Sequence, residues 1–351
     1  MKEMILPMKI PVLNAYSAIA HEFSILSNYE NAIPWFMSNL IQISNQYSGN
    51  METYVNFYRP HLYWDCPWIQ TQAISTDIIN LNEKWNGNIL EFIKDSIRLG
   101  HYVRVHLNHL YIPLSGKNHN FVHDSLIYGY NDSENTLYAA DNFKDRKYSF
   151  EKIGYSEFEQ AYKEKRDVGS NLYTSKYILL MKYQPDAVYD FNLDHVIVQL
   201  KHYLNSTDPY KDFISGCSQA DSDFSFGMEV YEKLKAYLQR IALLQTDADV
   251  RGFYFLVTHK KAMLLRLEYM ENNRFLNKSL NFSMNYAEVH KLSVMLCNLL
   301  LKYNATKQKS ILLKVIDGMD TFISKEIDLL TSLIEHLPEA KRPVDRIGAI
   351  N

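Results

Sequence analysis

The chain has 351 residues, 47% of them hydrophobic, so it is long enough for two domains with a sizeable core. Its 37 basic and 40 acidic residues give a formal net charge of -3, and no basic run is long enough for a phosphate-binding arm, so no nucleic-acid partner is expected. Three cysteines at unrelated spacings, Cys66, Cys217 and Cys297, argue against a disulfide framework and a paired zinc pattern.

The N-terminal segment MKEMILPMKIPVLNAYSAIAHEF differs from a signal peptide, because Pro7, Lys9 and Pro11 interrupt its apolar stretch. No run approaches the roughly 20 apolar residues that span a bilayer. We therefore expect a soluble, cytoplasmic protein without membrane association.

Aromatic residues are abundant and turn formers are scarce, with 26 Tyr and 17 Phe against 12 Gly and 10 Pro. Aromatic side chains bury large areas with few rotamers. We interpret the excess mainly as core packing, with the lining of a cleft for an extended apolar ligand as the alternative.

The first predicted elements are two helices and a strand. Apolar residues recur at helical spacing from Asn14 to about Asn28, and Asn14 is an acceptable N-cap, so a helix is predicted to begin beside it. A second helix is predicted over 89–99, with Gly100 as its stop, followed by the strand-like run 101–114.

After the loop SGKNHNF, the segments VHDSLIYGY and NTLYAADNF are predicted as the two strands of a hairpin, joined by the polar turn NDSE. A short helix over 155–163, capped by Ser156, leads to a last strand, SKYILLMKYQP, and Pro185 marks a boundary. A first domain of helices followed by an antiparallel sheet is therefore predicted over residues 1–185.

Strand patterns nearly vanish beyond residue 186, and long amphipathic patterns replace them. Five bundle helices are predicted, within HVIVQLKHYL, FGMEVYEKLKAYLQRIALL, VRGFYFLVTHKKAMLLRLEYM, NYAEVHKLSVMLCNLLLKY and KSILLKVIDGMDTFISKEIDLLTSLIEHL. The polar tail PEAKRPVDRIGAIN is expected to be loosely held. The fold class is therefore predicted as α+β, with an all-α helical domain over residues 186–351.

One local pattern in the hairpin carries possible chemistry, because His123 opens its first strand and Asp141 closes its second. Residues near the outer ends of paired antiparallel strands are neighbours, so the imidazole and the carboxylate are expected to meet. Such a carboxylate fixes the tautomer of a general base and stabilises its imidazolium. A surface histidine and a turn aspartate are the alternative interpretation.

An N-terminal helix, a strand that starts with His123, a Gly-Tyr pair before a polar turn and Asp141 at the end of the next strand together resemble the bacteriocin-processing-peptidase form of the papain fold. The closer similarity is to the N-terminal domain family of butirosin biosynthesis protein H. The segments SFGMEVYEKLKAYL and YFLVTHKKAMLLRLEYM resemble the helical C-terminal region of its relatives. The resemblance implies a papain-like domain, with His123 as catalytic base and Asp141 as its orienting carboxylate.

The resemblance also implies a cysteine nucleophile at the start of the first long helix, where the helix dipole and N–H groups lower a thiol pKa and stabilise an oxyanion. In LNAYSAIAH that position is Ala15, which has no nucleophilic group. Asn14, Tyr16 and His119 are expected to line the substrate site. No Gln precedes Ala15 at the papain-like position, so the oxyanion donor stays open.

Three explanations for Ala15 compete. Ala15 replaces a cysteine in order to trap a substrate or acyl complex, or the chain is a natural pseudoenzyme that only binds, or another residue is the nucleophile. Ser17 lies about half a helical turn away and is disfavoured. Cys66 precedes Pro67, a favourable first helical residue, so its thiol is a candidate for a helix N-terminus. A small buried residue is the alternative for Cys66.

The other histidines and basic residues are given structural roles. His101, His106 and His109 are spaced by five and three, which does not line up metal ligands on a strand, so no metal is expected. His259 and Lys260, on one predicted helix with Arg266, are interpreted as a polar helix face, or as a docking site for an acidic carrier-protein helix. No cofactor motif is present.

The resemblance implies an acyltransferase or amide synthase of specialised-metabolite (antibiotic) biosynthesis. It would move an acyl group from an acyl carrier protein or another acyl thioester, through a cysteine acyl-enzyme, to a small amine. The alternatives are a silent ligand-binding pseudoenzyme and a cysteine protease on the same fold. The oligomeric state stays open, a homodimer included.

Overall fold

The structure, a computed structural model, describes residues 2–46, 53–58, 66–144, 147–165, 176–209 and 224–339. They form two compact units: the sheet unit, within Met1–Ala32 and His61–Tyr189, and the helical unit, within Ile33–Pro60 and Asp190–Asn351. The sequence pattern placed residues 33–60 in the first domain, whereas the structure groups them with the C-terminal helices. Cys217 and most of the expected polar tail lie outside the described residues.

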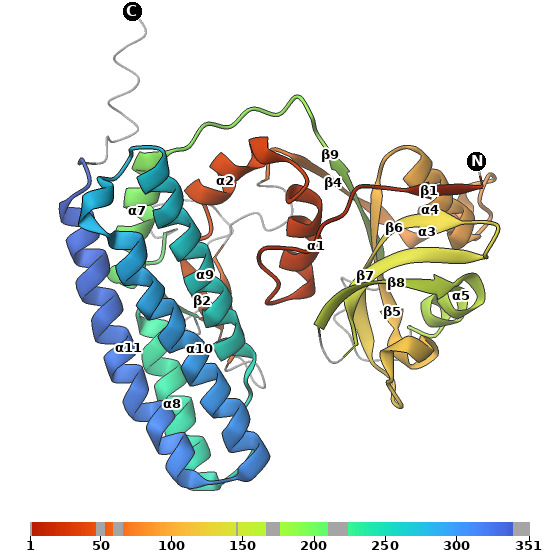
Figure 1. The fold of residues 1–351 in the computed structure, drawn as a ribbon. Coiled ribbons are helices and arrows are strands. Elements are labelled where there is room, and N and C mark those ends of the chain that lie inside the picture. Colours follow the sequence, from red (N-terminus) through yellow and green to blue (C-terminus); the bar gives the residue numbers. More distant parts are fainter. Residues whose placement is uncertain are drawn as a thin grey trace, which may run out of the picture. The chain divides into compact units, whose positions relative to one another are not determined.

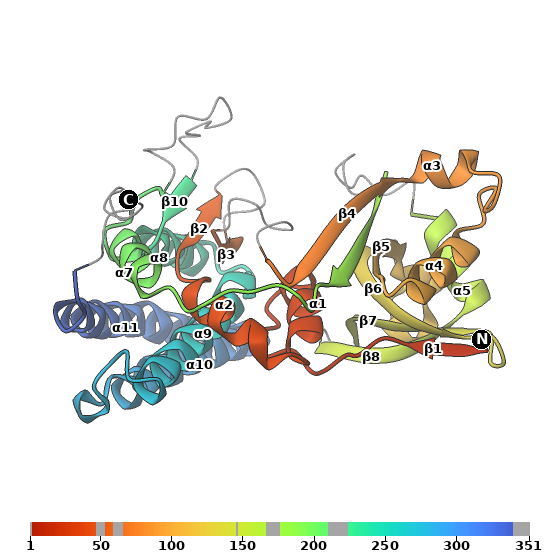
Figure 2. The same cartoon turned by 90° about the horizontal axis from the view of Figure 1, so that it is seen from above.

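The sheet unit is built on an antiparallel sheet in the order β4-β9-β5-β6-β7-β8, with β1 paired to β6 (Figure 1). Its strands are β1 (Glu3–Ile5), β4 (Ile69–Ser75), β5 (Tyr102–Asn108), β6 (Val122–Asn131), β7 (Thr136–Lys144), β8 (Lys147–Gly154) and β9 (Tyr177–Tyr183). The antiparallel sheet, the β6–β7 hairpin and the last strand, β9, confirm the prediction. Figure 2 shows β4 and β9 side by side along one edge of this sheet.

Helices and 3-10 turns accompany this sheet: α1 (Ser17–Leu26), η1 (Glu30–Ala32), α3 (Thr76–Leu81), α4 (Ile89–Arg98), η3 (His109–Tyr111), η4 (Pro113–Ser115) and α5 (Tyr155–Lys163). The prediction for α4 is confirmed, because the Asn88 side chain caps it and Gly100 follows it at φ +83. The strand-like run 101–114 is strand only as far as Asn108, after which the chain turns through η3 and η4.

Two predicted helix starts are wrong. The first helix begins at Ser17 rather than beside Asn14, and its N-cap is Tyr16, whose side chain makes no capping hydrogen bond. Ser156 is not the cap of α5, because Gly154 holds that position. The Glu157 carboxylate accepts a hydrogen bond from the Gly154 N–H at 2.9 Å, which satisfies the free backbone donor before α5.

The helical unit contains α2 (Ile33–Ser38), α7 (Leu193–Leu204), α8 (Glu229–Leu244), α9 (Arg251–Asn272), η5 (Lys278–Leu280), α10 (Phe282–Thr306) and α11 (Lys309–Glu335). All five predicted bundle helices are confirmed, and Figure 1 shows α8, α9, α10 and α11 running alongside one another. The all-α prediction is wrong in one respect. A small antiparallel sheet, in the order β10-β2-β3, joins this unit through β10 (Phe224–Phe226), β2 (Ile43–Gln46) and β3 (Val55–Phe57).

Buried polar groups of α9 explain why residues 33–60 belong to the helical unit. His259 donates a hydrogen bond from Nε2 to the carbonyl oxygen of Ile41 at 2.8 Å. His259, Lys260 and Arg266 are all buried, with 1% exposure or less. The prediction of a polar helix face is therefore wrong, and these residues offer no surface on which an acidic helix docks.

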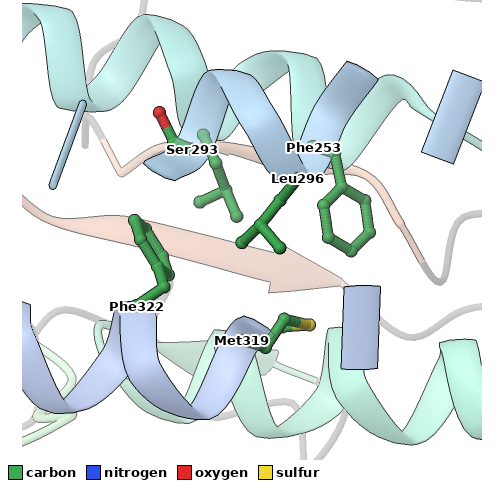
Figure 3. Close-up of a pocket in the computed structure, with 6 residues that line it drawn as sticks. Phe253, Ser293, Leu296, Met319 and Phe322 are labelled. Atoms are coloured by element: carbon green, nitrogen blue, oxygen red, sulfur yellow. The ribbon is translucent and has the colours of Figure 1, made fainter. Parts of the chain in front are cut away.

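Aromatic side chains fill the cores of both units, as the composition predicts. The largest fully buried side chains include Trp35, Trp68, Tyr102, Tyr130, Tyr203, Tyr231, Tyr286, Tyr303, Phe143, Phe158 and Phe253. Within the bundle, side chains of α9, α10 and α11 surround a cavity of about 10 Å³ (Figure 3). That volume is about the space of one water molecule, so this apolar cavity offers no room for a larger ligand.

Among the described helices, none combines the length and the apolar character that crossing a membrane requires.

Candidate functional site

The site with the clearest chemistry lies in the β6–β7 hairpin of the sheet unit. Leu126 pairs with Ala140, which places the next residue of β7, Asp141, beside Ser125. His123 lies two residues before Ser125, on the same face of β6. Its Nδ1 lies 2.8 Å from Oδ1 of Asp141. The contact that the hairpin spacing predicted between these two residues is thus present.

Asp141 is completely buried and accepts hydrogen bonds on both oxygens. Oδ1 accepts from His123 and from the N–H of Asn142 at 2.6 Å, and Oδ2 accepts from the Ser125 hydroxyl at 2.6 Å. Burial by itself would raise the pKa of Asp141. The charge of His123 and the hydrogen bonds outweigh it, so the pKa of this carboxyl lies well below its ordinary value and Asp141 is ionised.

The bond to Asp141 fixes the tautomer of His123. Because Nδ1 carries the donated proton, Nε2 is the nitrogen with a free lone pair. The His123 side chain as a whole is 26% exposed. Burial lowers the pKa of His123, but the charge of Asp141 and the hydrogen bond to it outweigh burial and raise the pKa above its usual value. Phe121 stacks on the ring, with centroids 5.2 Å apart.

A second histidine, His109, lies against the same carboxylate. It opens η3, directly after β5, and its Nε2 lies 3.2 Å from Oδ2 of Asp141 and 3.3 Å from the Ser125 hydroxyl oxygen. The ring is fully buried and stacks on Phe143 at 5.3 Å. His109 was missed as a site residue because 101–114 reads as one strand in the sequence. The Asn108 side chain, which caps η3, is the available signal that the strand ends there.

Ala15 lies in a bend directly before α1 and is half-buried, as are its neighbours Asn14 and Tyr16. The helix that follows is held by His21, whose Nδ1 lies 2.7 Å from the Tyr148 hydroxyl and whose Nε2 lies 3.2 Å from the carbonyl oxygen of Asp124. An alanine side chain forms no hydrogen bond, so none joins Ala15 to His123 or Asp141.

A second buried charge cluster lies next to α1. Asp124 accepts two hydrogen bonds from Nε of Arg104, at 2.6 and 2.8 Å, and lies 3.9 Å from Nε2 of His21. Adjacent residues of a strand project to opposite faces, so Asp124 and His123 leave β6 on opposite sides. Burial lowers the pKa of His21 to about 4, so His21 is neutral near pH 7. This cluster holds α1 on the sheet.

The other candidate residues occupy different places. Cys66 is buried and precedes a turn into β4, so the prediction that it opens a helix is wrong. Ser17 is the first residue of α1. His119 is exposed in the loop before β6, with its ring centroid 6.3 Å from that of Phe121. His106 pairs across the ladder with Asp124, away from the Asp141 carboxylate.

A polar cleft of about 460 Å³ lies between α3, the start of α4 and the end of α5. It is lined by Asn80, Asn88, Tyr162, Lys163 and Lys165, among others. The chain after α5 connects this cleft to the hairpin, because the side-chain amide of Asn108 donates to the carbonyl oxygen of Glu164 at 3.1 Å. Asn108 in turn pairs with Val122, the residue before His123.

Comparison with family models finds none that matches this chain, and no curated protein matches it. The fold and the site by themselves define the chain as an α+β protein with a hydrogen-bonded His–Asp pair in an antiparallel hairpin.

Proposed function

We propose that this chain has a papain-like scaffold for acyl transfer, in which His123 and Asp141 form the general-base pair and Ala15 occupies the nucleophile position. A chain with cysteine at position 15 would be an amide synthase that takes an acyl group from a carrier-protein or other thioester and gives it to an amine. The chain with alanine binds the same donor without forming an acyl-enzyme.

The observation that supports the proposal best is the 2.8 Å hydrogen bond between His123 and Asp141. An ionised, fully buried carboxylate holds Nδ1 as a donor and leaves Nε2 with a free lone pair, on a side chain that is 26% exposed. A general base needs this tautomer and this orientation. A surface histidine with a turn aspartate, the alternative interpretation of the sequence, does not require Asp141 to be buried.

The proposed chemistry has two steps and belongs to the Ala15→Cys protein. The new thiolate attacks the thioester carbonyl, the carbon–sulfur bond of the donor breaks, and His123 supplies the proton to the departing thiol. The amine then attacks the acyl-cysteine, His123 accepts the proton of the amine, the amide bond forms and the thiolate at position 15 is released. Asp141 stabilises the imidazolium whenever His123 is protonated.

Backbone N–H groups at the start of α1 are the proposed donors to the oxyanion of this reaction. The first N–H groups of a helix have no partner within the helix, and the Tyr16 side chain does not cap them. Position 15 precedes the helix by two residues, so such donors would lie on the C-terminal side of the nucleophile. This arrangement replaces the Gln that papain-like sites use and this sequence lacks.

A second candidate function, a silent binding protein on the same scaffold, is favoured by Ala15 itself. The cleft that contains Lys163 and Lys165 suits a donor with an acidic group, because these two cations outnumber the one carboxylate of its lining, Glu159. If Ala15 is native, binding of the thioester is the whole function. A cysteine protease is the weaker alternative, to be recognised by cleavage of a labelled peptide without thioester turnover.

The test is the Ala15→Cys protein mixed with an acyl thioester and followed by intact mass. The proposal expects an added mass of one acyl group at position 15, which Cys66→Ala does not abolish and His123→Ala does. An adduct that disappears in Cys66→Ala would move the nucleophile to Cys66. Thioester binding without any adduct, in the presence of an intact His123–Asp141 pair, would favour the silent binding protein.

A further inference from the structure

Three potential metal ligands converge in the sheet unit. The ligand atoms of His109, His123 and Asp141 all lie within 4.8 Å of one another. They come from three elements, η3, β6 and β7, which the sheet and the turn after β5 hold together. Asp141 and His109 are fully buried and His123 is 26% exposed, so a fourth position could open only beside His123.

The donor set is that of a transition-metal site. Two imidazoles and one carboxylate suit zinc and related divalent ions, whereas magnesium and calcium prefer oxygen ligands. Three protein ligands with one open position is also the usual composition of a site where an ion meets water or a ligand. The Ser125 hydroxyl, bonded to Oδ2 of Asp141 at 2.6 Å, would orient the carboxylate from outside.

We propose that His109, His123 and Asp141 form a binding site for one divalent transition-metal ion, with zinc as the ion that suits the ligands best. This inference goes beyond the proposed acyl transfer, and it implies that a bound ion would inhibit that reaction. An ion bound at Nδ1 of His123 leaves Nε2 protonated, so His123 cannot act as a base while the metal is bound. Bound zinc would thus prevent general-base catalysis by His123 in the Ala15→Cys protein.

The ligand environment limits the expected affinity. When Nε2 of His109 binds an ion, its proton moves to Nδ1, a buried atom with no hydrogen-bond partner among the described residues. Metal-binding histidines usually donate the other N–H to an acceptor, and loss of such a partner weakens binding by about 10- to 100-fold. We therefore expect zinc to bind more weakly than at a structural zinc site, and reversibly on addition of a chelator.

The test is a titration of the native chain with zinc chloride in a calorimeter. Ala15 is kept, so that no thiol at position 15 competes for the ion. The proposal expects saturable binding of one ion, with affinity at least about 10-fold lower in His109→Phe and in His123→Ala. The phenylalanine keeps the stack on Phe143 while removing the ligand nitrogen, and unchanged circular dichroism shows that each variant is folded.

A matched control is His119→Ala, which removes an exposed histidine of the neighbouring loop and is expected to leave the affinity unchanged. Excess magnesium chloride is expected not to compete. Absence of saturable zinc binding, or equal binding by the native chain and both ligand variants, would overturn the inference. Neither result involves a thioester, so the zinc titration does not test acyl transfer in Ala15→Cys, which is measured separately by intact mass.

Discussion

Arg266 on α9 donates a hydrogen bond from Nε to the carbonyl oxygen of Met37 at 2.8 Å, and from Nη2 to the carbonyl oxygens of Asn39 and Leu40. These carbonyls follow or end α2, where a helix leaves acceptors without partners. A buried guanidinium thus satisfies the end of a short helix 229 residues away in sequence. The contact explains why residues 33–60 belong to the helical unit.

Replacing Arg266 with Met is therefore expected to destabilise the helical unit by about 3 kcal/mol, because several buried carbonyls lose their donor. Urea unfolding followed by circular dichroism measures the loss. The matched control is Arg251→Met, which removes an exposed arginine bonded to Asp249 and is expected to cost less than about 1 kcal/mol. Equal losses in the two variants would contradict the capping role.

Lys260 and Glu326 form a second buried polar contact of the helical unit. Nζ of Lys260 lies 2.6 Å from Oε1 of Glu326 and 2.8 Å from the Tyr203 hydroxyl, and both charged side chains are fully buried. Burial lowers the pKa of Lys260 to about 8, and Glu326 counteracts that effect. The Tyr231 hydroxyl also accepts a hydrogen bond from Nζ, and Nδ1 of His259 lies 3.0 Å from Nζ.

Removal of one partner is expected to cost more than removal of both charges. Lys260→Met leaves the Glu326 carboxylate buried without a cation and should destabilise the unit by about 3–5 kcal/mol. The double variant Lys260→Met, Glu326→Gln should recover part of that loss, because no uncompensated charge remains. Chemical unfolding of the single and double variants measures both effects, and a double variant less stable than Lys260→Met would refute the argument.

The buried His21 predicts a pH dependence of stability. Burial lowers its folded pKa to about 4, below the unfolded value of about 6.5. Between these values the unfolded state takes up a proton that the folded state does not bind. His21 therefore contributes stability that is fully present above about pH 6.5 and is lost as the pH falls to about 4, about 3 kcal/mol in total at about 1.36 kcal/mol per unit.

Urea unfolding at several pH values tests this dependence. The variant His21→Gln is expected to flatten the loss of stability between about pH 6.5 and about pH 4, because the substituted side chain does not titrate. The exposed His336 gives the control, since His336→Gln should keep the native pH dependence. If the His21 variant keeps the full slope, another group is responsible.

The sequence predicts the long periodic elements and the contact between neighbouring strands. The helix over 89–99 and the five bundle helices have a clear helical period, and the polar turn NDSE marks the hairpin that brings His123 to Asp141. The local sequence pattern is sufficient to predict these features, because each helix shows its own period and the two strands of the hairpin are close in sequence.

Very short strands, and contacts between residues that are distant in sequence, could not be predicted from the local pattern. The strands β1, β3 and β10 have three residues each, too few for a period. β1 and β10 also pair with strands that are distant in the sequence. The burial of Arg266 and Lys260 depends on partners in residues 37–40 and in α11. From a helical pattern alone, a charged residue is predicted to lie on the surface, because the pattern does not show the distant partner that allows it to be buried.

The glycine of the Gly-Tyr pair, Gly129, lies where the neighbouring strand leaves little room for a side chain. It pairs with Ile5, and a Cβ at this position would lie 2.7 Å from the carbonyl oxygen of Met4. Gly129→Ala is therefore expected to displace β1 and to cost about 1–3 kcal/mol. Hydrogen exchange should become faster at β1. Gly154→Ala, whose Cβ would have the Glu157 side chain as its nearest neighbour at 3.4 Å, is the control and should leave the exchange of β1 unchanged.

Asp141 is expected to control the rate of acylation in the proposed chemistry. In the Ala15→Cys background, Asp141→Asn is expected to slow acylation by about 10³- to 10⁴-fold, because an amide favours the wrong tautomer of His123 while keeping the shape of the side chain. The rate is measured by rapid mixing with an acyl thioester and intact mass.

The control in the same background is Asp132→Asn. This aspartate pairs with Lys94 and should leave the rate within about twofold, since it lies beyond the opposite end of β6 from His123. A loss of acylation in Asp141→Asn with unchanged circular dichroism would assign the carboxylate to the reaction rather than to folding. An Asp141→Asn rate equal to that of the Ala15→Cys parent would mean that the buried His123–Asp141 bond is structural, and that any acyl transfer uses another base.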